Sequence, residues 1–509
     1  MLGIVPSATL LGADGHPVTV EVHITTGTLP GFTVVGLPDA SCREARDRVR
    51  AAIQVSGLQW PNAKVTVNLA PPTVRKVGSG LDLALAVAVL LASGQLEPQQ
   101  VAGLSFLGEL GLDGTVRPVA GTVCMTEALG TGPLVLPAAS AEEAAVIGGR
   151  VLHPVTTLAE VVACARGEEP WPLPSPHREL PDPPALPDLA DVRGQPVARY
   201  ALEVAAAGGH HLLMLGPPGG GKTMLAARLP SLLPPLTPQQ ALETTRIHSA
   251  AGIGLPPGGL VRQPPFRAPH HGASSVALVG GGAPHMRPGE ISAAHHGVLF
   301  LDELAEFTPH VLDALRQPLE EGMVRVARAA ATVTFPARFL LVAAMNPCPC
   351  GYGGQPGGCR CTEGARVRYQ RRLSGPLLDR FDLRIEVQRP SAHDLFGPPT
   401  GEPSAAVAER VRAARERAEA RGVPCNAALP ASQLDELAPL DPAATDLLLG
   451  ALAAGRLSAR GLHRVRRVAR TVADLSGGPP VLTRAHVATA LSLRVDGAAL
   501  GIPVQALAG

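Results

Sequence analysis

The chain has 509 residues, of which 46% are hydrophobic and only 3% aromatic, and its formal net charge is +1. This length predicts roughly two to four domains, with cores built mainly from Ala, Val and Leu. The near-neutral charge excludes a protein that binds polyanions over its whole surface and leaves local basic patches open. The N-terminal sequence lacks the basic start of a signal peptide, and the longest apolar run, 83–92, is too short to cross a membrane. We expect a cytoplasmic protein without membrane contact.

The first third of the chain, residues 1–167, alternates strand and helix patterns. Alternating polarity predicts strands at 31–37 and 64–70. Periodic or continuously apolar runs predict helices at 40–57 and 81–94, the second buried nearly all round. An Asp-Gly pair between two alternating runs at 108–119 predicts a hairpin. We expect a compact domain of the α/β or α+β class.

A proline-rich stretch ends this region. Residues 168–187 hold eight prolines in twenty positions, and proline breaks helices and cannot donate to a sheet. We expect a stiff linker that could separate two domains by up to about 60 Å, at about 3.1 Å per residue. A loop lying flat on one domain is the alternative. Beyond it, the pattern predicts a doubly wound α/β domain at 188–390 and a helical domain at 391–509.

A glycine-rich loop follows the apolar strand expected at 211–215. It fits G-x-x-x-x-G-K-[ST], and an apolar helix pattern comes next, which is the strand–loop–helix context of a phosphate-binding loop. Lys222 would reach the β- and γ-phosphates of a nucleotide, and Thr223 would give its hydroxyl to Mg²⁺. The predicted ATP-binding residues of this loop are Gly216, Pro217, Pro218, Gly219, Gly220, Gly221, Lys222 and Thr223.

Two acidic residues follow a later apolar strand, predicted at 298–301. Asp302 would hold Mg²⁺ through water, and Glu303 would polarise the attacking water. This pair indicates a hydrolase rather than a simple nucleotide binder; an ordinary helix N-terminus is the plain alternative. A third apolar strand ends in Asn346.

Four cysteines lie directly after Asn346, in the spacing C-x-C, eight residues, C-x-C. Their thiolates could form a tetrahedral zinc site, which would be structural because four thiolates leave no open position on the metal. A loop of reduced thiols and a redox clip are the alternatives. The candidate zinc ligands are Cys348, Cys350, Cys359 and Cys361.

Helical patterns dominate the C-terminal region. Residues 405–422 are amphipathic, and residues 457–475 place five apolar side chains on one face. Thr483 is a predicted N-cap for a further helix. We expect a small helical domain.

Several stretches together resemble one family. The loop "GPPGGGKT", with "FRAPHH", "GVLFLDEL", "AAMNPCPCG", "SGPLLDRFDL" and the N-terminal "PGFTVVGLPDA", is similar to the ComM/YifB family of Mg-chelatase-like AAA+ ATPases, over essentially the whole chain. The resemblance implies a homo-hexameric, ATP- and Mg²⁺-dependent motor acting on single-stranded, forked or branched DNA. In that family, ComM is tied to natural transformation, as a helicase that extends DNA branches. Recombination proteins are implied as partners.

The resemblance also implies roles for three residues. Asn346 would act as sensor 1, which touches the γ-phosphate and water. Arg380 would be an arginine finger that reaches into the ATP site of the neighbouring subunit. Arg460 would be sensor 2, a lid arginine that reads the γ-phosphate. Local pairing of Arg380 with Asp379 or Asp382 is the structural alternative.

Two insertions fit the same branch of AAA+ proteins. Residues 266–292 would form a hairpin inserted in a helix, and residues 320–339 a second hairpin. In ring translocases such hairpins point into the pore, where Arg325 and Arg328 could contact phosphates; solvated strand residues are the equal alternative. We expect a loop or interface role for the pair His270-His271, for which the sequence offers no acidic partner.

The N-terminal region resembles the Lon protease catalytic domain. Such a protease needs a Ser nucleophile and a Lys that activates it. Here the nucleophile position falls on Gly80, beside Ser79, and Val123 stands near the place of the lysine. We therefore expect a Lon-like fold that is inactive as a protease, with Ser79 as a helix N-cap and a role in DNA binding or assembly. Acidic residues interleave a basic cluster and predict a solvated helix face; the cluster is Arg43, Arg46, Arg48 and Arg50.

Two further functions remain as alternatives. One is a Mg-chelatase-type ATPase that remodels a metal-inserting partner; the Lon-like region and the cysteine cluster count against it. The other is an ATP-dependent protease, and the missing lysine counts against that. The motifs favour a DNA translocase or branch-migration helicase, and the choice of DNA as its track rests on the family resemblance.

Overall fold

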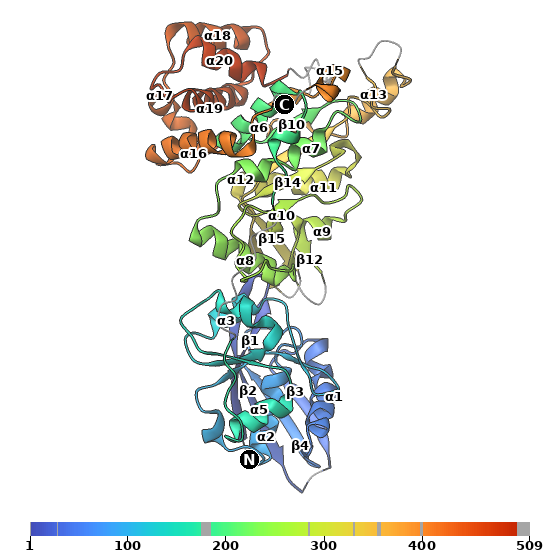
Figure 1. The fold of residues 1–509 in the computed structure, drawn as a ribbon. Helices are drawn as coiled ribbons and strands as arrows, with labels where there is room; N and C mark the ends of the chain where they lie inside the picture. Colours follow the sequence, from blue (N-terminus) through green and yellow to red (C-terminus); the bar gives the residue numbers. More distant parts are fainter. Residues whose placement is uncertain are drawn as a thin grey trace.

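The structure is a computed structural model that describes residues 2–27, 29–174, 185–282, 286–328, 331–353, 358–397 and 401–495. Half of the proline-rich stretch predicted as a linker, residues 175–184, lies outside the described part. Figure 1 shows an elongated molecule with the N-terminal region at one end, a central parallel sheet, and a group of helices at the other end. No helix of the described residues is long and apolar enough to cross a membrane.

The N-terminal region is built on a four-stranded sheet of order β1-β2-β4-β3. Its strands are β1 (Leu2–Leu11), β2 (Asp14–Thr25), β4 (Lys64–Ala70) and β3 (Gly31–Val35), and only the β3–β4 pair is parallel. Helix α2 (Asp82–Ala92) is buried at every residue, as its continuous apolar run predicts, and α1 (Ala40–Val55) packs against it. These elements share one hydrophobic core.

A second, smaller layer completes this region. Its parallel sheet has the order β5-β8-β9, and an antiparallel pair, β6–β7, forms the predicted hairpin. The elements are β5 (Ser105–Phe106), β6 (Glu109–Leu110), β7 (Val116–Arg117), α3 (Thr122–Ala128), β8 (Leu134–Pro137), α4 (Ala141–Ala145), β9 (Leu152–Val155) and α5 (Leu158–Ala165).

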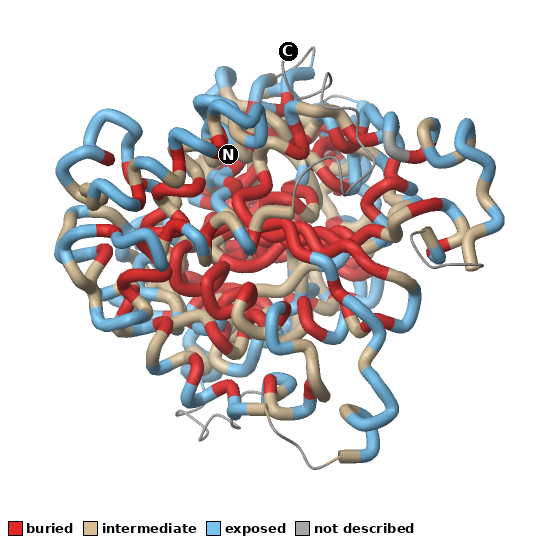
Figure 2. The backbone as a smooth tube through the Cα atoms, turned by 90° about the horizontal axis from the view of Figure 1, so that it is seen from above, coloured by how far each residue is buried: buried red, intermediate tan, exposed pale blue. Residues whose placement is uncertain are grey.

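The central sheet is parallel throughout and has the order β11-β14-β17-β10-β18. Its strands are β11 (Phe266–Arg267), β14 (Val298–Leu301), β17 (Leu340–Met345), β10 (Leu212–Leu215) and β18 (Leu383–Glu386). The three middle strands are buried at every residue because helices cover both faces, which is why their sequences are uninterrupted apolar runs. Figure 2 shows the buried segments as a band through the middle of the molecule. This mixed α/β arrangement is consistent with an AAA+ core.

Helices and two hairpins surround this sheet. The hairpins are β12 (Gly280–Gly281) with β13 (Arg287–Pro288), and β15 (Met323–Arg328) with β16 (Ala331–Pro336), at the two places where insertions are predicted. The helices are α6 (Pro196–Gly208), α7 (Lys222–Ala226), α8 (Pro238–Ala251), α9 (Ser275–Val279), α10 (Glu290–Ala293), α11 (Pro309–Ala314), α12 (Arg316–Glu321), α13 (Glu363–Gln370), α14 (Gly375–Leu378) and α15 (Ala392–Phe396).

The C-terminal region is helical, as predicted. It comprises α16 (Ser404–Ala420), α17 (Leu434–Leu437), α18 (Pro442–Ala453), α19 (Ala459–Leu475) and α20 (Arg484–Ser492), and Thr483 is the N-cap of α20. Inside it, Asp474 is fully buried and is compensated by Arg470, Arg421 and Asn426. A buried carboxylate requires such partners, so this network ties α19 to the end of α16. The apolar faces of these helices join the core on one face of the central sheet.

The N-terminal region packs directly against the central domain. Ala13, in the β1–β2 turn, and Cys124, on α3, belong to the same hydrophobic cluster as Phe335 on β16. The backbone N–H of Gly121 donates to the carbonyl of Ser249 on α8 at 2.9 Å, and the N–H of Val123 donates to the Ser249 hydroxyl at 3.3 Å. The two regions therefore share a packed interface rather than being held apart.

Candidate nucleotide site

The glycine-rich loop connects β10 to α7 at the carboxyl end of the central sheet. Gly219 and Gly221 have φ angles of 76° and 84°, in the left-handed region that favours glycine. A Cβ at Gly216 would collide with the carbonyl oxygen of Val387. The pattern of the sequence and the shape of the loop therefore agree at these positions.

Lys222 lies inside this loop. Its Nζ donates to the carbonyl oxygens of Gly216 and Pro217 at 2.7 and 3.0 Å, and to Oδ1 of Asn346 at 3.1 Å. Burial lowers the pKa of the ammonium group, although the negative charges of Asp302 and Glu303 raise it. The structure thus brings together the lysine of β10–α7 and the asparagine at the end of β17, two residues that sequence analysis places in one site.

Two oxygen ligands of the kind that Mg²⁺ prefers lie side by side in the same site. The Thr223 hydroxyl donates to Oδ2 of Asp302 at 2.6 Å, and the backbone N–H of Glu303 donates to Oδ1 of the same carboxylate at 2.9 Å. A hydroxyl and a carboxylate at the ends of neighbouring segments fit a hard divalent cation. Glu303 itself has a φ of 51°, an uncommon conformation for a non-glycine residue that is found at functional sites.

One contact in this site is absent from the sequence-based expectations. His271 Nδ1 lies 3.1 Å from Oε2 of Glu303, and the imidazole ring is nearly perpendicular to the ring of Phe307. His271 follows β11, whereas Glu303 follows β14, and these two strands pair in parallel. The expectation that His270-His271 lacks an acidic partner is therefore wrong for His271. The only signal in the sequence is that both residues follow strands of the same sheet.

The structure places Arg380 and Arg460 away from Lys222. Arg380 precedes β18, which pairs in parallel with β10, while Lys222 follows the end of β10, so the two residues lie at opposite ends of the sheet. Burial, followed by the positive charges of Arg464, Arg460 and Arg316, lowers the pKa of Arg380, which shows that these arginines are neighbours. Within the described part of the chain, the predicted site residues therefore lie in two separate groups, one around Lys222 and the other around Arg380.

The local alternative, in which Arg380 pairs with Asp379 or Asp382, is wrong. Arg380 forms an ion pair with Glu320 of α12, not with Asp379 or Asp382. Asp379 pairs with Arg384, and Asp382 pairs with Arg464 at 2.5 Å. Burial opposes the ionisation of Asp382, yet the hydrogen bond from His210 and the charge of Arg464 hold its pKa well below the usual range.

The four predicted cysteines converge. The sulfur atoms of Cys348 and Cys350 are 3.3 Å apart, and both lie 3.8 Å from the sulfur of Cys359. The Cys361 sulfur is within 4.8 Å of the other three. Four thiolates at 2.3 Å from a central zinc ion would be separated by about 3.8 Å, the edge of the tetrahedron. The cluster can therefore accept a metal ion with little movement.

The predicted features of the N-terminal region are only partly present. Ser79 is not the N-cap of α2, which is Leu81; its hydroxyl donates to the carboxylate of Glu109 instead. Val123 is buried in α3, and Lys76 contacts the carbonyl of Pro71. No lysine is therefore hydrogen-bonded to Ser79 among the described residues.

The basic cluster of α1 is also not a uniform solvated face. Arg48 forms a hydrogen-bonded ion pair with Asp82, whose side chain is 1% exposed, at 2.6 Å. Burial raises the pKa of Asp82 to about 6 although Arg48 acts in the opposite direction. Arg46 pairs with its neighbour Asp47 at the surface, as the interleaved charges predict. Arg48 is thus a structural residue that joins α1 to the start of α2.

Comparison with known protein families agrees with this geometry. Residues 188–395 match the family described as magnesium chelatase, subunit ChlI, and residues 401–494 match its C-terminal domain. Residues 20–139 match a further domain described as subunit ChlI of Mg-chelatase. The parallel sheet and its phosphate-binding loop lie within the first of these matched regions. Together they define a magnesium-chelatase-like protein of the AAA+ class.

Full-length relatives narrow the assignment. The chain is 45% identical to YifB of Escherichia coli over 500 residues, which covers 97% of both chains. It is 43% identical to competence protein ComM of Haemophilus influenzae over 504 residues, again 97% of both. A 38 kDa magnesium-chelatase subunit of Acidiphilium rubrum matches only 22% of the chain, at 31% identity. The chain belongs to the ComM/YifB family of Mg-chelatase-like proteins.

Proposed function

We propose that the chain hydrolyses ATP at the loop of residues 216–223. Lys222 would bind the β- and γ-phosphates, and its ammonium group is already held in the loop by two carbonyl oxygens. Thr223 and Asp302 would hold Mg²⁺, which neutralises phosphate charge during the reaction. Glu303 would orient and polarise the attacking water, and Asn346 would contact the γ-phosphate. The observation that carries the proposal is the convergence of residues from β10, β14 and β17 on one sheet edge.

The active form would be a ring, with six copies as the family resemblance implies. Arg380 and Arg460 are neighbours at the end of the sheet opposite to Lys222, so neither is positioned to serve the ATP site of its own chain. A cation supplied by the adjacent copy would stabilise the charge that develops on the transferred phosphoryl group. The arrangement of Arg380 and Arg460 on one shared surface supports an oligomer in which that surface faces the next nucleotide.

DNA would be the substrate on which this motor acts, as a translocase or branch-migration helicase. The support is the full-length similarity to a protein named competence protein ComM. The N-terminal region would have a Lon-like fold without proteolysis, and it would serve as a binding or assembly module. Its interface with α8 and β16 connects it directly to the ATPase core.

The cysteine cluster would hold a structural zinc ion. Cys348 lies two residues after Asn346, so an ion bound there would fix the loop that begins at the nucleotide site. The sulfur separations of 3.3 to 3.8 Å support this assignment.

A magnesium-chelatase-type remodelling ATPase is the second candidate. The three family matches to chelatase subunit ChlI favour it. We favour the DNA motor over this candidate, because the similarity to ComM spans the full length whereas the chelatase subunit from Acidiphilium rubrum matches only 22% of the chain.

The test is the steady-state rate of ATP hydrolysis with and without single-stranded and forked DNA, at two salt concentrations. We expect DNA to raise the rate and salt to weaken this effect, because phosphate contacts release counterions. Lys222→Ala should abolish hydrolysis under all conditions. A rate that no DNA changes would reject the DNA motor and favour a protein-remodelling ATPase.

A further inference from the structure

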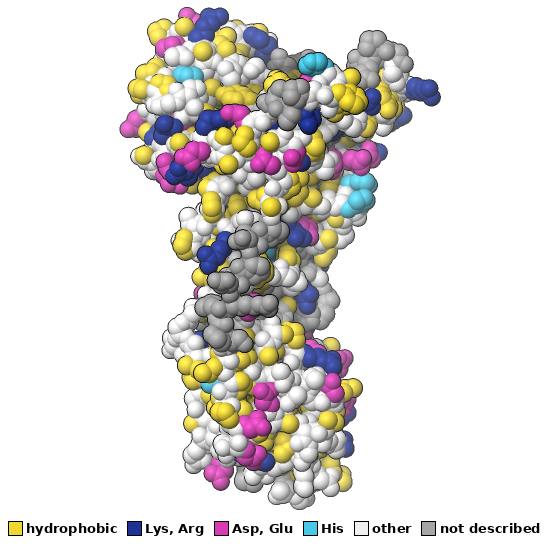
Figure 3. All heavy atoms as spheres, viewed as in Figure 1, with side chains coloured by type: hydrophobic (Ala, Val, Ile, Leu, Met, Phe, Trp, Pro, Cys, Tyr) yellow, Lys and Arg dark blue, Asp and Glu magenta, His cyan; other side chains and the backbone are white. Residues whose placement is uncertain are grey.

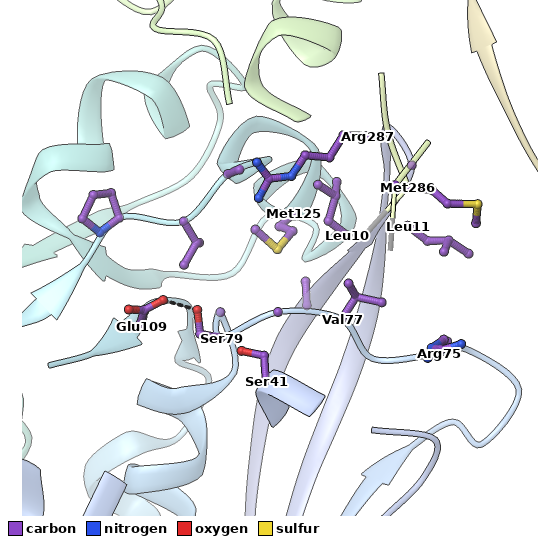
Figure 4. Close-up of a pocket in the computed structure, with 18 of the residues that line it drawn as sticks. Leu10, Leu11, Ser41, Arg75, Val77, Ser79, Glu109, Met125, Met286 and Arg287 are labelled. Carbon is purple, nitrogen blue, oxygen red and sulfur yellow. Dashed lines mark hydrogen bonds between the residues drawn. The ribbon is translucent and has the colours of Figure 1, made fainter. Parts of the chain in front are cut away.

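A cavity of about 650 Å³ lies where the N-terminal region meets the two hairpins of the central domain. One wall is formed by β1, the segment 75–80 and the segment 118–120. The other is formed by residues of the β12–β13 hairpin, including Met286 and Arg287, and by Arg328 at the end of β15. A volume of this size between two structural units is typical of ligand sites. Figure 4 shows Arg287 facing Ser79 and Glu109 across this space, with Arg75 further along.

Three arginines line the cavity, and they come from three separate segments: Arg75, Arg287 and Arg328. Within the described part of the chain, none of them forms an ion pair or a side-chain hydrogen bond. Arg325, on the same hairpin as Arg328, is by contrast paired, and it lies 3.6 Å from Glu321. Guanidinium groups without partners are available to bind an anion, and their fork geometry matches phosphate oxygens.

The remaining lining limits what kind of anion fits. Leu10, Val77, Val119 and Met125 give the cavity an apolar side, which suits a flat or aliphatic body rather than a bare inorganic ion. Among the described residues of the lining, Glu109 is the one carboxylate, and one of its oxygens accepts the Ser79 hydroxyl. Its other oxygen can accept an N–H from a ligand. A nucleotide unit combines these three features: a phosphate, a base with an apolar face, and N–H donors on the base edge.

We propose that this cavity binds one nucleotide unit of a nucleic-acid strand, with its phosphates on Arg75, Arg287 and Arg328 and its base on the apolar side near Glu109. This inference rests on the proposed action on DNA and deepens it by naming where the strand is held. Two of the arginines belong to hairpins of the ATPase core, and the third belongs to the N-terminal region. A strand bound there bridges the two units, so movement of the hairpins during ATP turnover would act on it directly.

A free nucleotide offers the same chemistry as a strand, and an acidic peptide offers charge alone. Against the peptide, carboxylates lack the aromatic body that the apolar side accommodates. Figure 3 shows basic and acidic side chains interspersed over the visible face of the molecule, with no continuous basic path. We therefore assign phosphate binding to the cavity, which three arginines without described partners line.

The experiment measures binding of fluorescein-labelled 20-nucleotide oligo(dT) to the full chain by anisotropy, with Mg²⁺ and a non-hydrolysable ATP analogue present and the salt concentration varied. The variant is Arg75→Ala/Arg287→Ala/Arg328→Ala. The matched control is Arg50→Ala, an exposed arginine of the N-terminal region outside the cavity. We expect the triple variant to lose about tenfold or more in affinity and its salt slope to fall by about 2, since each contact on a single strand contributes about 0.7. Arg50→Ala should match the unmodified chain.

Unchanged affinity and salt slope in the triple variant would overturn the proposal that the cavity binds DNA, and would not contradict the proposed DNA motor. If the unmodified chain neither binds DNA nor changes its rate of hydrolysis with DNA, the proposed function fails. The ligand of the cavity is then tested in Lys222→Ala chains, in which a 5′-phosphorylated thymidine dinucleotide and polyglutamate compete for binding. Dinucleotide binding that the triple variant loses would support a free-nucleotide site. Polyglutamate binding in its place, or no binding of either, would overturn it. If the triple variant does not fold, the single Arg→Gln variants are measured, and three unchanged salt slopes would overturn the proposal.

Discussion

The carboxylate of Glu303 is held by His271, whose Nδ1 lies 3.1 Å from Oε2. Both side chains are partly exposed, at 36% and 51%. An exposed pair of this kind contributes about 0–1 kcal/mol, so the contact can be broken at low cost. The contact with His271 occupies one oxygen of the Glu303 carboxylate, the group that we propose to polarise the attacking water. Glu303 is thus in contact with a side chain from the segment that follows β11.

The first prediction concerns this contact. His271→Ala should raise the rate of ATP hydrolysis without DNA by up to about fivefold, which corresponds to about 1 kcal/mol. Stimulation by DNA should shrink by a similar factor, because the contact is already gone. The matched control is His270→Ala: the ring of His270 lies tilted against that of His271, with centroids 4.1 Å apart, but has no described contact with Glu303. A His271→Ala rate that falls below the unmodified rate would show that His271 supports catalysis instead.

The second prediction tests whether Arg380 acts on the neighbouring copy. Arg380→Ala should reduce ATP hydrolysis by about a thousandfold or more, the usual contribution of an arginine finger. Mixing Arg380→Ala chains with Lys222→Ala chains should restore part of the activity, because some interfaces then combine an intact loop with an intact arginine. Glu320→Ala, which removes the partner of Arg380 within the chain, should keep most of the activity. Mixtures as inactive as their components would reject action between copies.

The third prediction concerns the cysteine cluster. The purified chain should contain one zinc ion per copy by elemental analysis, and Cys348→Ser/Cys359→Ser should contain almost none. Loss of the ion should lower the temperature of thermal unfolding, because a bound metal stabilises only the folded state. Cys425→Ser is the control, since Cys425 lies outside the cluster. Zinc content that is absent from the unmodified chain would instead favour reduced thiols or a redox clip.

Local patterns predicted local structure well. The phosphate-binding loop, the wholly buried α2 and the β15–β16 hairpin follow from contiguous residues, because glycine positions and hydrophobic periodicity act within one element. Contacts between elements were not predictable in the same way. The Arg380–Glu320 pair depends on how α12 packs against the segment before β18. The prediction that Ser79 is a helix N-cap is wrong because α2 begins three residues later and because Glu109, from the β6–β7 hairpin, accepts the Ser79 hydroxyl.

His295 provides the basis for the fourth prediction. It is 2% exposed, its Nδ1 accepts the backbone N–H of Arg338 at 3.0 Å, and its Nε2 lies 3.5 Å from Glu243. Since Nδ1 accepts, a neutral ring carries its proton on Nε2 and donates to Glu243, which argues against a metal ion among Glu243, His295 and His296. Burial, together with the charge of His296, lowers the pKa of His295 from 6.5 to about 4.

The folded state therefore keeps His295 neutral at pH values at which the unfolded chain takes up a proton. The resulting stability is complete above pH 6.5 and is lost as the pH falls toward 4, with about 2 kcal/mol gone by pH 5. His295→Asn keeps an acceptor for the N–H of Arg338 and removes this titration. Its thermal midpoint should fall less between pH 7.5 and 5 than that of the unmodified chain, whereas the exposed His310→Asn should behave like the unmodified chain. Equal falls in all three proteins would mean that the acid sensitivity comes from other groups. Glu243 is one of them, because its histidine partners lower the pKa of its carboxyl group although burial raises it.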